Sequence, residues 1–334
     1  MLRPKLLSSI SSINNFSRFR SMSFQKEIHS IKTIETIPSF RSWRRQFMKQ
    51  DKQVAFVPTM GSLHEGHLKL VKLASEHCPI VVVSIFVNPA QFAPNEDLDK
   101  YPRTLSHDLE LLRSLNCVDT VFLPKVKDIY PSGIPLEIEK QKGTFVEVKG
   151  KSHQLEGTTR PSFFRGVSTV VAKLFNIVQP DHVFFGQKDA QQCIVIRSLI
   201  SDLHFPIEMH VGPTKREHDG LAMSSRNQYL TPEMRNYAIT LYNALTTIKD
   251  ELDKGKRNRE ILLSKGYEIV EEATQKVKEK NLGFELKLDY LSIADPTTLD
   301  ELQEIEEGKG AIISGALFVG RTRVLDNLLF NCTL

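Results

Sequence analysis

Apolar residues recur along this chain at two alternating spacings, beginning near residue 31. Short apolar runs rich in β-branched residues predict strands at residues 54–57, 80–87, 118–123, 182–185 and 207–211. Between these runs the apolar positions return at helical spacing, which predicts helices at residues 39–50, 64–77, 106–115, 166–178 and 191–203. The run at 80–87 is almost continuously apolar, as is typical of a strand buried on both faces of a parallel sheet.

Regular alternation of strands and helices with short connections is the pattern of an α/β fold. It predicts a Rossmann-like, doubly wound parallel sheet over residues 27–212. Ligands of such sheets bind beyond the carboxyl ends of the strands. The segments that follow residues 54–57 and 182–185 are therefore expected to contribute to a binding site.

The pattern changes after residue 212. Two helices, strongly charged on one side, are expected at residues 231–253 and 256–280, and short strands at 289–294 and 310–319. We therefore expect residues 213–334 to form a smaller C-terminal α+β domain.

Net charge is +4 over 334 residues, and its location decides what it means. Residues 1–26 hold five of the 44 basic residues and none of the 40 acidic ones, so the rest of the chain is close to neutral. Because residues 27–334 are close to neutral and show no stripe of basic residues, we expect no nucleic-acid partner. Residues 1–26 form an N-terminal extension, rich in Ser and basic residues, that resembles a mitochondrial presequence. Both a mitochondrial and a cytoplasmic location remain open.

Apolar runs and cysteines exclude two further classes of protein. No run reaches the roughly 18–20 apolar residues of a membrane-spanning helix, so no membrane role is expected. The four cysteines show no Cys-x-x-Cys pairing and read as reduced thiols rather than a disulfide framework or a zinc site.

The most informative segment is residues 59–67, between the strand at 54–57 and the next helix. A strand that turns into a helix presents free backbone N–H groups and the positive end of the helix dipole. His64 and His67 lie three residues apart and share one face of the first turn. Gly66 lacks a Cβ, so a ring or ribose could approach the backbone. These features suit a nucleoside triphosphate; the alternative is a capped helix start with two solvent-facing histidines.

A second strand-to-helix junction follows residues 182–185. Lys188 supplies a cation for phosphate, and Asp189 could bind a ribose hydroxyl or cap the following helix. Gln192 lies one turn further on and offers both a donor and an acceptor.

Two more segments carry candidate residues. Ser224 and Ser225 beside Arg226 could surround an oxyanion with donors, although such a tripeptide alone is more often a loop or an N-cap. Gln91 follows the strand at 80–87 and could bind a hydroxyl or carboxylate, while Tyr101 could form apolar wall. Taken singly, these last two residues read as structural.

Together the motifs resemble those of the adenylate-forming nucleotidyltransferase superfamily, and within it the pantothenate synthetase (pantoate–β-alanine ligase) family. The resemblance covers roughly residues 30–330. The matching segments follow the order of that family: Pro58-Thr59-Met60-Gly61, His64-Glu65-Gly66-His67, Phe86-Val87-Asn88-Pro89 with Gln91-Phe92, Tyr101-Pro102-Arg103-Thr104, Gly186-Gln187-Lys188-Asp189 and Met223-Ser224-Ser225-Arg226-Asn227.

The resemblance implies a two-stage reaction. ATP converts pantoate to pantoyl adenylate with release of pyrophosphate, and β-alanine then displaces AMP to form pantothenate. The implied catalytic residues are His64, His67, Lys188 and Arg226, with His67 as a proton donor. The implied ATP-binding residues are Met60, Gly61, His64, Gly66, His67, Gly186, Lys188, Asp189, Lys215, Met223, Ser224, Ser225 and Arg226. The implied residues for pantoate and β-alanine are Gln91, Gln192 and Tyr101.

The resemblance also implies a cofactor and an assembly state, and one residue departs from the family pattern. Mg²⁺ is expected to accompany the phosphates, with Asp108 as a carboxylate ligand. Lys215 stands where the family often has an apolar residue. A homodimer is the family expectation. The alternatives left open are a nucleotidylyltransferase of the same superfamily and a non-catalytic relative.

Overall fold

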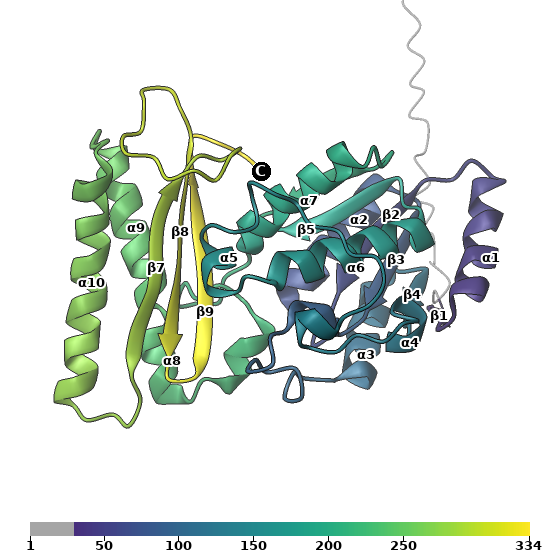
Figure 1. Cartoon of the computed structure of the whole chain (residues 1–334), viewed down its shortest axis with the longest axis horizontal. Coiled ribbons are helices and arrows are strands. Elements are labelled where there is room, and N and C mark those ends of the chain that lie inside the picture. Colours follow the sequence, from purple (N-terminus) through teal and green to yellow (C-terminus); the bar gives the residue numbers. More distant parts are fainter. Residues whose placement is uncertain (1–29) are drawn as a thin grey trace, which may run out of the picture.

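The computed structural model describes residues 30–334, which form two halves lying side by side (Figure 1). The N-terminal extension at residues 1–26, with its resemblance to a presequence, lies outside the described residues.

A six-stranded sheet organises the N-terminal half. The strand order is β1-β4-β3-β2-β5-β6, and neighbouring strands pair in parallel. The strands are β1 (Lys32–Ile34), β2 (Val54–Thr59), β3 (Ile80–Ile85), β4 (Thr120–Phe122), β5 (His182–Gly186) and β6 (Glu208–Gly212). The α-helices of this half are α1 (Ile37–Met48), α2 (Glu65–His77), α3 (Leu105–Leu115), α4 (Val126–Ile129), α5 (Glu156–Thr159), α6 (Phe163–Val178) and α7 (Ala190–Asp202). Short 3₁₀ turns are η1 (Pro89–Gln91), η2 (Ile138–Lys140) and η3 (Gln187–Asp189).

Helices bury both faces of this sheet. On one face, α1, α6 and α7 pack around Phe56, Val82 and Phe122. On the other, α2 and α3 pack against Val57 and Val83. The central strands β2 and β3 are therefore apolar at successive positions, and the predicted doubly wound sheet is confirmed.

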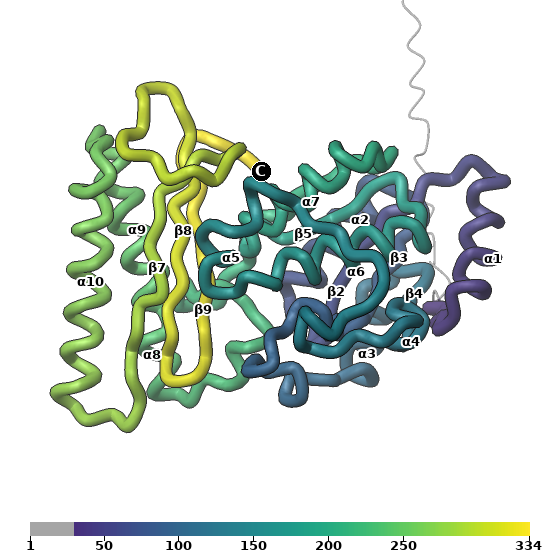
Figure 2. The backbone as a smooth tube through the Cα atoms, viewed as in Figure 1, coloured from purple at the N-terminus to yellow at the C-terminus, as the bar shows by residue number. Residues whose placement is uncertain are grey.

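A three-stranded antiparallel sheet organises the C-terminal half. Its order is β7-β8-β9, with β7 (Leu286–Ala294), β8 (Ala311–Val319) and β9 (Thr322–Phe330). The helices are α8 (Pro232–Ala238), α9 (Thr240–Asp253) and α10 (Arg259–Glu279), and η4 (Ser225–Tyr229) precedes them. Helices α9 and α10 cover the outer face of the sheet, and β9 lies nearest to the N-terminal half (Figure 2). The predicted smaller α+β unit is confirmed.

The sequence pattern missed β9 and merged two helices into one. Strand β9 carries Arg323, Asp326 and Asn327 within an apolar run, so its pattern did not match a buried strand. All three polar side chains are paired in the structure. The single helix expected at residues 231–253 is two helices, α8 and α9, which join at Ile239.

Within residues 30–334, no helix has both the length and the apolar character needed to cross a membrane.

Helix α6 fixes the loop that follows β3 through a close approach at Gly166. A Cβ built on Gly166 would lie 2.1 Å from the carbonyl oxygen of Ala90, and that carbonyl belongs to η1. The Asn88 side chain also donates a hydrogen bond to the Gly166 carbonyl, at 3.2 Å. The absence of a side chain at residue 166 therefore sets the position of η1 and of Gln91 at its end.

We predict that Gly166→Ala destabilises the protein by about 1–3 kcal/mol, because the added methyl group forces the helix and η1 apart. In an open helical position the same change would stabilise by about 1 kcal/mol. Urea unfolding monitored by circular dichroism gives the difference. Ser168→Ala is the matched control on the same helix: its buried hydroxyl has no hydrogen-bond partner among the described residues, so its removal should be neutral or stabilising. Equal stability of Gly166→Ala and wild type would contradict the close packing.

Candidate active site

A cleft of about 1170 Å³ opens between the two halves, beyond the carboxyl ends of β2 and β5. It exceeds the usual range for a single small ligand, about 300–1000 Å³. Most of the predicted site residues line it: Met60, His64, Gly66, His67, Gln91, Tyr101, Gly186, Lys188, Asp189, Gln192, Lys215, Met223, Ser224, Ser225 and Arg226. Gly61 and Asp108 do not, and both belong to the turn beneath the cleft.

That turn is held by the carboxylate of Asp108. Its oxygens accept hydrogen bonds from the backbone N–H groups of Ser62 (3.0 Å) and Leu63 (2.8 Å) and from the hydroxyl of Thr104 (3.1 Å). Asp108 is 1% exposed, so the structure does not support its predicted role as a Mg²⁺ ligand. Gly61 adopts φ +81°, and a Cβ there would lie 3.0 Å from the Asp108 Oδ2 atom. Both residues shape the turn rather than touch the cleft.

His64 and His67 cap helix α2 reciprocally. The Nδ1 atom of His64 accepts from the Gly66 N–H at 3.2 Å, and the Nδ1 atom of His67 accepts from the His64 N–H at 3.3 Å. A neutral ring whose Nδ1 accepts a hydrogen bond carries its proton on Nε2. The alternative interpretation of this segment predicted a capped helix start with two solvent-facing histidines. The cap is confirmed, but the histidines line the cleft instead.

Both imidazoles are held in the neutral form. Burial, followed by the charge of Lys188, lowers the pKa of His64 to about 4. Burial, followed by His64 and Lys188, lowers the pKa of His67 well below its ordinary value. The two rings lie 4.1 Å apart between centroids, so a charge on either would oppose a charge on the other. At neutral pH the pair acts as two N–H donors rather than two cations.

Gly66 serves a different purpose from the one the sequence indicated. A Cβ at this position would lie 2.9 Å from Cε1 of the His64 ring. The missing side chain makes room for His64 to fold back over the helix start, so the imidazole occupies the space expected for a ligand.

The C-terminal half positions Lys188. The amide of Asn327, on β9, donates to the carbonyl oxygens of Gln187 (2.9 Å) and Lys188 (2.8 Å). Asn327 is 2% exposed, so this junction is buried. The Lys188 ammonium lies 3.3 Å from an Asp189 oxygen. Asp189 does not cap α7 through its side chain, which excludes the capping alternative in this structure.

The segment around Ser225 closes the cleft from the C-terminal side. The Ser225 hydroxyl donates to the Ser62 carbonyl at 3.0 Å and so joins the two halves. The Arg226 guanidinium donates twice to Asp97, at 2.9 Å each, and stands 5.4 Å from the centre of the Tyr101 ring. Burial raises the pKa of Asp97, but the hydrogen bonds and charge of Arg226 outweigh it and lower that pKa below its ordinary value. Arg226 is thus already paired with a carboxylate.

Gln91 is oriented by Asn88, to which the sequence analysis gave no role of its own. Asn88, 1% exposed, donates to the Gln91 Oε1 atom at 3.0 Å and accepts from the Tyr130 hydroxyl at 2.6 Å. With its oxygen held, Gln91 keeps its amide N–H₂ group for a ligand. Gln192 lines the same cleft, whereas its neighbour Gln191 is buried and hydrogen-bonds to backbone groups of residues 151–156.

A chain of ion pairs along the cleft was not foreseen. Arg160 pairs with Glu96 at 2.7 Å and with Glu156 at 3.3 Å, and Arg323 on β9 pairs with Glu156 at 2.7 Å and with Asp289. Arg323, Asp326 and Asn327 interrupt the apolar run of β9, and these interruptions were the one signal in the sequence. The chain crosses from one half to the other, so it fixes the width of the cleft.

The arrangement suits a triphosphate and a small carboxylate bound side by side. Two neutral N–H donors, the Lys188 ammonium and the Ser224 and Ser225 segment surround one end of the cleft, and Gln91 and Gln192 provide amides for a second ligand. Donors fixed before binding stabilise charge that develops on phosphate oxygens without further reorganisation.

Comparison with known proteins agrees with this geometry. The family model described as pantoate–β-alanine ligase matches residues 32–329. A pantothenate synthetase of Herpetosiphon aurantiacus is 45% identical over 299 residues, which covers 90% of this chain and all of the relative. The crystal structure of the Thermus thermophilus pantothenate synthetase has a TM-score of 0.76 at 42% identity and covers 89% of this chain and 99% of its own.

A third relative has ligands. The pantoate–β-alanine ligase of Francisella tularensis, described as complexed with beta-gamma ATP and β-alanine, has a TM-score of 0.67 at 33% identity and covers 91% of this chain and 99% of its own. A family match over nearly the whole described chain, with relatives above 40% identity along their full length, leads to one conclusion: the chain belongs to the pantoate–β-alanine ligase family.

Proposed function

We propose that this protein condenses pantoate with β-alanine, using ATP and releasing AMP and pyrophosphate. The observation that carries the proposal is the convergence of the capped histidine pair, Lys188 and the Ser225 segment on one cleft that also contains Gln91 and Gln192. Family membership and the ligands of the Francisella relative support it.

The chemistry balances in two displacements. A pantoate carboxylate oxygen attacks the α-phosphorus of ATP, and the bond to pyrophosphate breaks. The β-alanine amine then attacks the acyl carbon of the adenylate, AMP leaves and the nitrogen loses a proton. Because the attacking carboxylate is already ionised at pH 7, the first step needs positioning and charge stabilisation rather than a general base.

His64 and His67 are proposed to donate their Nε2 protons as hydrogen bonds to phosphate oxygens. Lys188 adds the positive charge, and its one close side-chain partner, Asp189, leaves it directed to the cleft. Arg226 holds Asp97 through Nε and Nη2, so its Nη1 group is the donor proposed to bind a phosphate while the Asp97 pair stays in place.

Mg²⁺ is proposed to bind mainly through ATP. Mg²⁺ prefers oxygen ligands and commonly uses phosphates, water and one or two carboxylates. Asp189, partly exposed beside Lys188, fits that role and lines the cleft. When bound, the ion would offset charge on the phosphates. The homodimer and the mitochondrial or cytoplasmic location stay predictions.

AMP formation tests the function directly. Purified protein is incubated with ATP and Mg²⁺, and pantoate and β-alanine are omitted in turn. AMP that requires both substrates is expected. AMP retained in a nucleotide product would indicate a nucleotidylyltransferase, and no turnover would indicate a non-catalytic relative.

We predict that His67→Asn lowers the adenylation rate by about 10²-fold or more, the usual cost of losing one preorganised donor. The Asn side chain can still accept the His64 N–H, so the helix cap is kept while the Nε2 donor is lost. Pantoate-dependent exchange of pyrophosphate into ATP measures the step. His107→Asn, on the exposed face of α3, is the control and should behave as wild type. Near-normal exchange in His67→Asn would rule out the donor role.

Lys188→Ala should abolish ATP-dependent turnover and leave the fold intact. The turn that carries Lys188 is held through its backbone by Asn327, so the side chain is free for ligand binding. Calorimetry of ATP binding and a melting curve separate the two effects. A melting transition that collapses along with activity would show that Lys188 is a structural residue instead.

The depressed pKa of His64 predicts a specific titration. In the ligand-free protein its ring should stay neutral from pH 7 down to about pH 4, well below the ordinary value of 6.5. Because the folded pKa lies below the unfolded one, the stability linked to this group is present above pH 6.5 and is lost as the pH falls through 4. NMR titration of the ring protons provides the measurement. A midpoint near 6.5 would show that burial and Lys188 do not lower the pKa of His64.

A further inference from the structure

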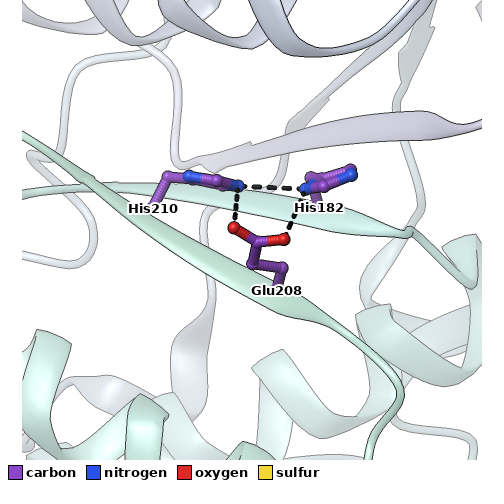
Figure 3. Close-up of side chains that lie close together, drawn as sticks. All are labelled: His182, Glu208 and His210. Carbon is purple, nitrogen blue, oxygen red and sulfur yellow. Dashed lines mark hydrogen bonds and ion pairs between the residues drawn. The ribbon is translucent and has the colours of Figure 1, made fainter.

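A second cluster of ionisable side chains lies at the amino ends of β5 and β6, at the end of the strands opposite to the cleft. It consists of His182 on β5 and Glu208 and His210 on β6 (Figure 3). The His182 Nδ1 atom lies 3.0 Å from the His210 Nε2 atom. Glu208 reaches both rings, with one oxygen 3.7 Å from His182 and the other 3.5 Å from His210. Two ring nitrogens and the two carboxylate oxygens of Glu208 therefore face one another.

These separations fit one small divalent ion. Ligands about 2.0–2.2 Å from a tetrahedral zinc ion lie about 3.3 Å from one another. The three observed separations, 3.0, 3.5 and 3.7 Å, lie around this value. Two imidazoles and one carboxylate select late transition metals over Mg²⁺ or Ca²⁺, which prefer all-oxygen sites. We propose that His182, Glu208 and His210 form a binding site for a zinc-type divalent ion, with solvent as the fourth ligand.

The protein holds these ligands in place before any ion arrives. Backbone pairing aligns His182 with Glu208 across β5 and β6. The His210 ring stacks on Phe184, with a centroid distance of 4.7 Å and an interplanar angle of 14°, and His77 packs 4.5 Å from it. The His182 and His210 side chains are only 14% and 17% exposed, so their rings have little freedom to turn. Preorganised rings lose little entropy on binding, which favours affinity.

An ion can reach the cluster from solvent beside the Glu208 carboxylate. The Glu208 side chain is 67% exposed, so an ion can enter beside it without opening the core.

The site is separate from the ATP-binding cleft. Helix α2 carries His67 in its first turn and His77 at its last residue, about 15 Å apart along the axis. Strand β5 likewise runs from His182 at the proposed metal site to Gly186 at the cleft. An ion at the cluster would join β6, the edge strand of the sheet, to β5. Its expected effect is on the stability of that edge rather than on the reaction.

Cobalt binding tests the proposal with a signal independent of ligase activity. Untagged full-length protein, stripped by a chelator, is titrated with Co²⁺, whose visible absorption reports tetrahedral coordination by nitrogen and oxygen. Wild type is compared with Glu208→Gln and His210→Asn. His107→Asn removes an exposed histidine 3.9 Å from Glu110 and controls for loose surface binding. His64 and His67 are present in every variant, so any binding there is a constant background.

We expect each cluster variant to bind Co²⁺ at least about tenfold more weakly than wild type, and His107→Asn to bind as wild type does. Saturating Zn²⁺ should displace Co²⁺ and raise the Tm of wild type but not of Glu208→Gln. Glu208 is mostly exposed, so this variant should fold even if His210→Asn does not. Equal affinity and spectra in wild type and Glu208→Gln would overturn the metal site. Binding without a rise in Tm would overturn the link between β5 and β6.

Discussion

The active site depends on how the backbone N–H groups between β2 and α2 find hydrogen-bond acceptors. A helix start leaves such groups without partners in the helix, and buried ones must be satisfied from elsewhere. Here side chains supply the acceptors: Thr59 for Gly61, Asp108 for Ser62 and Leu63, and the two histidines for His64 and Gly66. Because each imidazole uses Nδ1 as an acceptor, each must present Nε2–H elsewhere. The hydrogen bonds that satisfy the helix start therefore also set the tautomer of both histidines, and with it the N–H donors that face the cleft.

The same need for partners couples the two halves of the protein. The turn that carries Lys188 is held from the other half, because Asn327 on β9 donates to the carbonyl groups of Gln187 and Lys188. Asp326, its neighbour, pairs with Arg216 just before the Ser225 segment. One strand of the C-terminal sheet thus positions both the cation and the loop opposite to it. The cleft belongs to neither half alone, which explains why a Rossmann-like sheet here needs a second domain.

Much of the fold and most of the site were predictable from the sequence because their signals are local. Apolar runs identified β2, β3 and β5, motifs at strand ends indicated His64 and Lys188, and the family resemblance added Ser225 to the same site. The roles of Asp108 and Gly66 were not predictable, since each depends on contacts between side chains and a turn whose geometry the spacing does not reveal. Asp108 lies 45 residues from Leu63, to which it is hydrogen-bonded. A carboxylate near a phosphate-binding motif suggests a metal ligand, and only its burial shows otherwise.

Strand β9 was missed for a related reason. Arg323, Asp326 and Asn327 break the apolar pattern because they bind partners outside their own strand, so the residues that hold the structure together also conceal the strand that carries them.

Arg226 is likewise held by a partner distant in the sequence, this time within the cleft. In the structure its charge is balanced by Asp97, and a buried, unpaired guanidinium would be costly. The pair uses Nε and Nη2, and the Nη1 group is not part of it. Under the proposed function a phosphate would therefore bind Arg226 beside Asp97 rather than in its place, so the carboxylate that orients the guanidinium would keep its partner while the phosphate gains one.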